Sequence, residues 1–253
     1  WELGAEIIPI GVYPDGTNIN KDVGATSVEA AKQAVLEYRA DLGIALDGDA
    51  DRVVMIDEKG GIIDGDQLLA LIANTWNNEG LLKGGAVVGT VMTNLGFEWF
   101  LEKKGLKLIR TPVGDRYVSE YMRAKSCNVG GEQSGHIILS DYARTGDGLV
   151  AALQALSMII ASNKPASEIM RVFEPVPQLL KSFKVNNSSL LEDNKIIEAI
   201  SSAETKLGTG GRLLVRKSGT ESLIRLMAQG DNEQTLHEVI DTLTETIYKR
   251  DKI

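Results

Sequence analysis

Three carboxylates alternate along a short stretch of the chain, directly after a predicted strand. Asp47, Asp49 and Asp51 are separated from one another by single small residues, which leave the backbone free to turn. Hard oxygen ligands gathered this closely suit Mg²⁺. Without a cation, mutual repulsion would raise the pKa values of the three carboxyls. We therefore expect this acidic loop, residues 47–52, to bind Mg²⁺. A solvated acidic turn is the alternative.

Two other classes of site also place alternating aspartates after a strand. A calcium EF-hand needs glycine where Arg52 stands and a loop where residues 53–56 have the composition of a strand, so we reject it. A Mg²⁺-dependent phosphatase would use Asp47 as its nucleophile. Such phosphatases usually carry Thr or Val where Asp51 stands, but the residues of the acidic loop alone do not exclude this class of enzyme.

A second loop, residues 131–136, has glycines at Gly131 and Gly135 and polar side chains between and after them. Glu132 and Ser134 offer an acceptor and a donor–acceptor one residue apart, which suits adjacent hydroxyls of a sugar. His136 could exchange a proton near neutral pH. An ordinary polar turn is the alternative for this glycine-flanked loop.

A third loop, residues 216–222, lies between two predicted strands, and a further arginine follows it. Hydroxyls, glycine-supported backbone N–H groups and two guanidiniums can together hold a phosphate group. The loop lacks the sequence of a nucleotide-binding P-loop and opens no helix, so a phosphoester is the better ligand. A hairpin with charged flanks is the alternative. The candidate phosphate ligands of this basic loop are Arg216, Ser218, Gly219, Thr220 and Arg225.

The elements that carry these loops alternate between strand and helix in the first two thirds of the chain. Residues 42–46 and 53–56 read as buried strands, residues 7–12 as a further strand, and residues 26–29 have the form of a helix capping box. Repeated strand–helix alternation predicts a mostly parallel, doubly wound sheet. After a proline-rich connector the predicted order becomes strand, helix, two strands and helix, which is typical of an α+β layer.

Composition limits the partners and the compartment. Of the 253 residues, 43% are hydrophobic and 25% charged, and the net charge is −8, so we expect neither nucleic-acid binding nor a membrane-spanning segment. Cys127 is the only cysteine, which favours a buried thiol and a reducing compartment such as the cytoplasm. Because the first residue is Trp1 and reads as the end of a helix, we expect the chain to be part of a longer protein.

The three loops in this order resemble the α-D-phosphohexomutases. The resemblance rests on D-G-D-A-D-R at 47–52, G-E-Q-S-G-H at 131–136 and R-K-S-G-T-E at 216–221, and it extends over nearly the whole chain. Residues 88–94 and 113–118 resemble the branch of the family that acts on glucosamine phosphates, with the phosphomannomutase/phosphoglucomutase branch as the alternative. Two departures are Lys217 and Ser222, which stand where the family often has proline.

The resemblance implies a mutase in which a phosphoserine donates its phosphoryl group to a phosphosugar and a bisphosphorylated sugar forms. The serine itself is not found in this chain, because no Ser directly precedes either histidine. The implied fold is α/β: two mutase-type α/β domains, the first incomplete, followed by a small α+β domain. The implied boundaries are residues 1–62, 63–172 and 173–253.

The resemblance also implies a role for each loop residue. The acidic triad of Asp47, Asp49 and Asp51 would hold Mg²⁺, with Arg52 near the phosphoserine. Gly114, Asp115, Glu132 and Ser134 would face the sugar, with His136 transferring a proton, and the five residues of the basic loop would bind the non-reacting phosphate. A further expectation is that the basic loop lies across a cleft from the acidic loop.

Overall fold

The computed structural model describes residues 3–186, 190–218 and 222–251, and the chain divides into two compact units. The first unit contains residues 1–93 and 97–174, and the second contains residues 94–96 and 175–253. Gly219 and Thr220, two of the expected phosphate ligands, lie outside the described residues.

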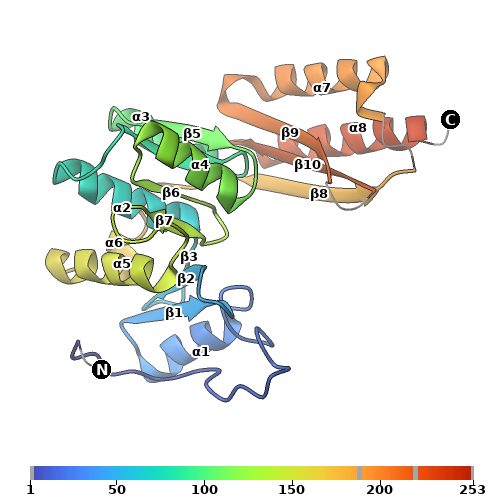
Figure 1. Cartoon of the computed structure of the whole chain (residues 1–253). Helices are drawn as coiled ribbons and strands as arrows, with labels where there is room; N and C mark the ends of the chain where they lie inside the picture. The colour runs from blue at the N-terminus through green and yellow to red at the C-terminus, as the bar shows by residue number, and fades with distance from the viewer. Residues whose placement is uncertain (1–2, 187–189, 219–221, 252–253) are drawn as a thin grey trace. The chain divides into compact units, whose positions relative to one another are not determined.

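The first unit contains two sheets and the helices around them (Figure 1). Its elements are α1 (Glu29–Tyr38), β1 (Leu42–Leu46), β2 (Val53–Asp57), β3 (Ile62–Ile63), α2 (Gly65–Asn78), β4 (Ala86–Thr90), β5 (Lys107–Thr111), α4 (Asp115–Lys125), β6 (Val129–Gly131), β7 (Ile137–Leu139), α5 (Gly148–Ser162) and α6 (Ala166–Ile169). The helix α3 (Leu95–Lys103) begins in the short segment that groups with the second unit and continues in the first.

The sheet that carries the acidic loop is antiparallel, contrary to the mostly parallel arrangement that the sequence pattern predicts. Its strand order is β1-β2-β3, and Leu46 faces Val53 across the turn. The reason is the length of the connection, because residues 47–52 are too few for a crossover between parallel strands and suffice for a hairpin. All five residues of β2 are buried, so the acidic loop is attached directly to the core.

The other sheet of the first unit has the order β5-β4-β6-β7. Here β4 runs parallel to both β5 and β6, as expected, while β6 and β7 form an antiparallel hairpin around the glycine-flanked loop. No described sheet runs continuously from Ile44 to Leu139; an isolated bridge between Arg52 and His136 connects the two regions. The division of this region near residue 62 stays a prediction.

Two local predictions near the N-terminus are wrong. Residues 7–12 form no strand: they have no ladder partner among the described residues, and a strand exists only when its backbone groups are paired. The helix α1 does not use a capping box, because its N-cap is Val28, which makes no side-chain cap bond. Ser27 instead donates its backbone N–H to the carbonyl oxygen of Gly24 and so belongs to the preceding turn.

The second unit has the predicted order of strand, helix, two strands and helix. It contains β8 (Gln178–Lys184), α7 (Asn194–Leu207), β9 (Gly211–Lys217), β10 (Leu223–Gly230) and α8 (Glu233–Asp251), with short 3₁₀ turns at Leu190–Glu192 and Gly208–Gly210. The sheet order is β8-β10-β9, all antiparallel, and α7 and α8 cover one of its faces (Figure 1). Its core includes Leu236, Ile240, Leu243 and Ile247 of α8, as their helical spacing predicts.

Candidate functional site

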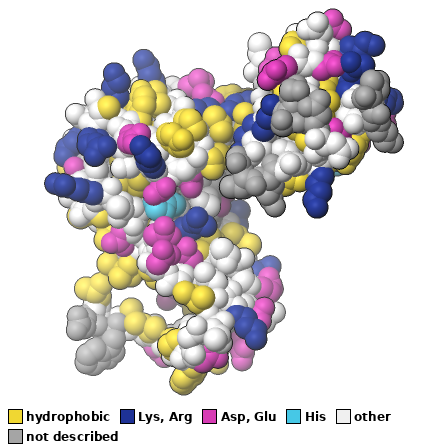
Figure 2. All heavy atoms as spheres, turned by 45° about the vertical axis from the view of Figure 1, so that its right-hand side comes forward, with side chains coloured by type: hydrophobic (Ala, Val, Ile, Leu, Met, Phe, Trp, Pro, Cys, Tyr) yellow, Lys and Arg dark blue, Asp and Glu magenta, His cyan; other side chains and the backbone are white. Residues whose placement is uncertain are grey.

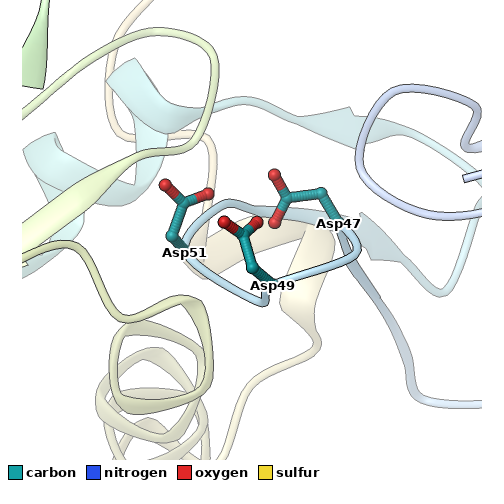
Figure 3. Close-up of side chains that lie close together, drawn as sticks. All are labelled: Asp47, Asp49 and Asp51. Carbon is teal, nitrogen blue, oxygen red and sulfur yellow. The ribbon is translucent and has the colours of Figure 1, made fainter. Parts of the chain in front are cut away.

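The acidic loop brings its three carboxylates together. The side chains of Asp47, Asp49 and Asp51 point toward one another from the turn between β1 and β2 (Figure 3). One ligand atom from each lies within 4.8 Å of the others. The backbone achieves this with Ala50 in the left-handed region at φ 58° and with a hydrogen bond of 3.0 Å from the N–H of Arg52 to Oδ1 of Asp47.

The electrostatics of the triad fit a cation. Burial, together with the neighbouring Asp47 and Asp49, raises the pKa of Asp51, while His136 acts in the opposite direction. A divalent cation bound between the three carboxylates would offset the repulsion between their negative charges. Arg52 also forms ion pairs with the triad, because its Nε lies 3.9 Å from Oδ2 of Asp47 and 3.9 Å from Oδ1 of Asp51.

His136 joins the acidic loop to the glycine-flanked loop. Its Nδ1 lies 3.0 Å from Oδ2 of Asp51, and its backbone forms the isolated bridge with Arg52. Its ring is buried, and Nε2 has no hydrogen-bond partner among the described residues. Figure 2 shows acidic side chains gathered next to a histidine on one face of the first unit, with basic side chains beside them.

The glycine-flanked loop is held in place from several sides. The N–H of Val53 donates to Gly135, and the N–H of Gly65 donates to Gln133, each at 3.0 Å. Glycine is required at position 135, because φ is +94° and a Cβ would lie 2.1 Å from the carbonyl oxygen of Val53. The loop therefore keeps Glu132 and Ser134 at a defined distance from the acidic loop.

Glu132 also contacts the segment before α4. Its Oε1 accepts a hydrogen bond of 2.9 Å from the backbone N–H of Gly114, so residues that the resemblance assigns to the sugar do meet in space. Asp115, the first residue of α4, is exposed next to this contact, as is Ser134 in its own loop. Two carboxylates, a hydroxyl and backbone groups are thus available here for a polyhydroxylated ligand.

The basic loop is the turn between β9 and β10 in the second unit. Arg216 and Arg225 face each other across these strands, and the N–H of Ser218 donates to the carbonyl oxygen of Leu223 at 2.8 Å. Like charges directly opposite each other on a sheet are unfavourable. An anion bound between the two guanidiniums would remove this repulsion, so the pair fits a phosphate group.

Comparison with known proteins assigns the family. Residues 64–176 match the model described as phosphoglucomutase/phosphomannomutase, alpha/beta/alpha domain III, and residues 180–246 match the C-terminal domain of the same family. The chain belongs to the phosphoglucomutase/phosphomannomutase family of α-D-phosphohexomutases.

Its relatives in this family include proteins named phosphoglucosamine mutase. The one from Rhodospirillum rubrum is 56% identical over 250 residues, covering 98% of this chain and 55% of the relative. The one from Zymomonas mobilis is 57% identical over 247 residues, covering 98% and 56%. The chain therefore spans about half the length of these curated relatives.

Solved mutase structures share the fold. An N-acetylphosphoglucosamine mutase from Aspergillus fumigatus, in complex with GlcNAc-6P and magnesium, has a TM-score of 0.69 at 21% identity, covering 92% of this chain and 53% of that one. An N-acetylglucosamine-phosphate mutase in its product complex also has a TM-score of 0.69 at 21% identity, with 89% and 53% covered. At this identity the likeness concerns the fold alone.

Within the mutase fold, sequence reasoning missed residues that support the site. Asp64 caps α2 by accepting from the N–H of Gln67, and its Oδ2 accepts from Gln133 of the glycine-flanked loop at 3.2 Å. Burial raises the pKa of the Asp64 carboxyl. An aspartate directly before a predicted helix indicates an N-cap, so the capping role of Asp64 could have been predicted from the sequence. Its hydrogen bond to Gln133 could not, because the two residues are 69 positions apart.

The cysteine and the helices of this mutase-family chain provide neither a reactive thiol nor a membrane span among the described residues. Cys127 is buried, as expected, and burial raises the pKa of its thiol, so it has the character of an inert core residue. Among the described residues, no helix is both long enough and apolar enough to cross a membrane.

Proposed function

We propose that the protein containing this chain is a phosphoglucosamine mutase, which interconverts glucosamine 6-phosphate and glucosamine 1-phosphate. The observation that carries the proposal is the contact between Asp51 and His136, which places a cation-binding triad directly beside a loop suited to sugar hydroxyls. The relatives of 55–57% identity that carry this name support it. A reducing compartment such as the cytoplasm accords with the single buried cysteine.

In this proposal the acidic loop serves the transferring phosphoryl group. Asp47, Asp49 and Asp51 hold Mg²⁺, which when bound neutralises charge on that group. Arg52, which is 42% exposed at its side chain, adds positive charge on the same side. The donor set of three carboxylates fits Mg²⁺, which usually keeps water and a phosphate oxygen among its remaining ligands.

The glycine-flanked loop orients the sugar. Glu132 uses Oε1 for the N–H of Gly114, and among the described residues its Oε2 receives no hydrogen bond, which leaves it to accept from a sugar hydroxyl. Ser134 can donate to or accept from a neighbouring hydroxyl. Gly114 and Asp115, at the start of α4, lie next to the place proposed for these sugar hydroxyls.

The basic loop binds the phosphate that is not reacting. A mutase must accept either end of its substrate at the reacting position, so the opposite phosphate needs a site that works in both orientations. Arg216, Ser218 and Arg225 offer two guanidiniums and a hydroxyl for this purpose, together with Gly219 and Thr220 of the same loop. We also propose that the domain boundaries lie near residues 62 and 172, so that the acidic loop, the glycine-flanked loop and the basic loop each belong to a different domain.

The phosphoryl group would pass from a phosphoserine to the free sugar hydroxyl: the P–O bond to the sugar forms as the bond to the serine oxygen breaks, the sugar hydroxyl gives its proton to a base, and the serine oxygen takes up a proton. In the second transfer the serine hydroxyl would lose its proton and attack the other phosphate of the bisphosphorylated sugar, and the sugar oxygen released there would take up a proton. The role of His136 as that base stays a prediction, since its Nε2 is buried in this conformation. Its contact with Asp51 is independent of that role.

The test is an assay of the full-length protein with the phosphates of glucosamine, glucose and mannose, in the presence of Mg²⁺ and a catalytic amount of bisphosphorylated sugar. We expect the highest kcat/KM with glucosamine phosphates and no turnover by residues 1–253 alone. A preference for mannose or glucose phosphates would assign the protein to the other branch. Hydrolysis of a chromogenic phosphate ester by residues 1–253, abolished by Asp47→Asn, would instead favour an aspartyl phosphatase.

A further inference from the structure

The segment that enters α5, residues 146–148, contacts both the acidic loop and the strand after the glycine-flanked loop. The N–H of Gly148 donates to the carbonyl oxygen of Ala50 at 2.9 Å, and the N–H of Asp147 donates to Ile137 at 3.2 Å. Asp147 also caps α5, accepting from the N–H of Val150 at 2.9 Å. The start of this helix is therefore bonded to both regions of the candidate site.

Gly146 packs against the ring of His136. A Cβ built on Gly146 would lie 2.4 Å from Cε1 and 2.4 Å from Nε2 of His136, and 2.8 Å from Cδ2. Carbon atoms do not approach this closely, so position 146 has no room for a side chain while the ring stays where it is. Because three ring atoms are this close at once, the Cβ would lie over the face of the ring. Nδ1 of the same ring lies 3.0 Å from Oδ2 of Asp51.

The ring has little freedom to move elsewhere. His136 is only 4% exposed, and its backbone is bridged to Arg52. Its Nδ1 is within hydrogen-bond distance of Asp51, and its buried Nε2 has no hydrogen-bond partner among the described residues. A side chain at position 146 would push the ring away from Gly146 and so move Nδ1 relative to the carboxylate of Asp51.

We infer that Gly146 is a positioning residue for the cation site: by lacking a side chain it lets the His136 ring hold the Asp51 carboxylate in the triad. The inference rests on the proposed function only in taking Asp47, Asp49 and Asp51 as the cation ligands. Residues that orient metal ligands commonly change metal affinity when they are replaced. Gly146→Ala should turn Asp51 away from the other two carboxylates and weaken cation binding.

The experiment is a titration of the full-length protein with Mn²⁺, a paramagnetic substitute for Mg²⁺, with free Mn²⁺ followed by electron paramagnetic resonance. We expect Gly146→Ala to weaken the Mn²⁺ affinity by about tenfold or more. The matched control is Gly210→Ala in the second unit, because a Cβ there meets only Oδ2 of Asp231 at an ordinary 3.6 Å. Its Mn²⁺ affinity should equal that of the wild type.

A second set of variants distinguishes positioning from a general effect on folding. His136→Asn places an amide donor near the position of Nδ1 and removes the part of the ring that touches Gly146. We expect it to bind Mn²⁺ more tightly than His136→Ala, and we expect Gly146→Ala to have no further effect in the His136→Asn background. This double variant gives a result even if Gly146→Ala alone fails to fold.

Three outcomes have different meanings. A wild-type protein that binds no Mn²⁺ would overturn the cation site of the proposed function, and the inference with it. Wild-type binding with unchanged affinity in a folded Gly146→Ala protein would overturn the inference alone. Additive losses in the Gly146→Ala/His136→Asn double variant would also overturn it, because Gly146 would then act independently of the ring.

Discussion

At the scale of single residues, the three aspartates of the acidic loop differ in their surroundings. Asp47 accepts the N–H of Arg52, and Asp51 is bonded to His136, so both contribute to the conformation of the loop. Asp49 is exposed, and its side chain has no hydrogen-bond or ion-pair partner among the described residues. A substitution of Asp49 should therefore change cation binding with the least effect on the stability of the fold.

We expect Asp49→Asn to weaken Mg²⁺ binding without destabilising the metal-free protein. The substitution removes a charged ligand, and it also removes repulsion between neighbouring carboxylates. Calorimetric titration with Mg²⁺ should show at least about a tenfold loss of affinity, while the Tm in EDTA should not fall. Asp41→Asn, at an exposed position before β1, serves as the control for removing one negative charge. A drop in the Tm of Asp49→Asn in EDTA would show that Asp49 has a structural role.

The facing arginines of the basic loop give a second residue-scale prediction. Arg225→Ala in the full-length protein should mainly raise KM, with a loss of about 1.5–3 kcal/mol of binding free energy if a charge-assisted hydrogen bond is removed. Its Tm without substrate should not fall, because Arg216 would no longer face a like charge. Steady-state kinetics with glucosamine 6-phosphate check this. Lys181→Ala, which removes a cation of the same sheet that pairs with Asp241, should leave KM unchanged; equal effects of the two variants would count against a specific phosphate site.

At the scale of elements, the helices of the second unit are joined by an ion pair at one end. Asp193 caps α7 by accepting from the N–H of Lys195, and its Oδ2 also accepts from Nε and Nη2 of Arg250 in α8 at 2.8 and 2.6 Å. The hydrogen bonds from Arg250 hold the pKa of Asp193 below its ordinary value. A carboxyl with a lowered folded-state pKa stabilises the fold above its unfolded-state pKa, and this contribution is lost as the pH falls through the lowered value.

Asp193→Asn should therefore destabilise the second unit at neutral pH and have no such effect in acid. Asn is as good an N-cap as Asp, so the substitution removes the charge and keeps the cap. Urea unfolding at pH 7 should show a lower unfolding free energy for the variant, and the difference should disappear as the pH falls from about 4 through the lowered pKa. Glu198→Gln, at an exposed position of the same helix, is the control. A difference that persists at pH 2 would mean that the cap, not the ion pair, was lost.

At the scale of the whole molecule, the two units have separate cores. The buried side chains of the first unit form clusters around α2, β4 and α5, while those of the second pack between its sheet and the helices α7 and α8. No residue is shared between these clusters. Each unit thus has its own source of hydrophobic stabilisation.

We expect a cavity in one core to leave the other unit folded. Ile196 of α7 is fully buried in the second core, and Ile196→Ala should cost that unit about 2–5 kcal/mol. Hydrogen exchange followed by mass spectrometry should show faster exchange in residues 175–253 and unchanged exchange in β2 and α2. Mn²⁺ affinity should also be unchanged in this variant. Faster exchange throughout the chain would show that the two units unfold together.

The sequence by itself determined the features that depend on neighbours along the chain. The alternating aspartates predicted a cluster of carboxylates, and their ligand atoms do lie within 4.8 Å of one another, because a tight turn keeps residues two apart close in space. The bounds of α7 and the buried face of α8 followed from helical periodicity, which is likewise local.

Only the tertiary structure decided the features that depend on a partner far away in the chain. The strand expected at residues 7–12 is absent, because a strand forms only where another strand pairs with its backbone. The antiparallel pairing of β1 and β2, by contrast, follows from the short connection 47–52, which is a local feature of the sequence. The bond between Asp51 and His136 joins residues 85 apart, and the contact of Gly146 with the ring depends on where α5 begins. Sequence spacing carries no information on such distances, because they are set by how the strands and helices pack against each other.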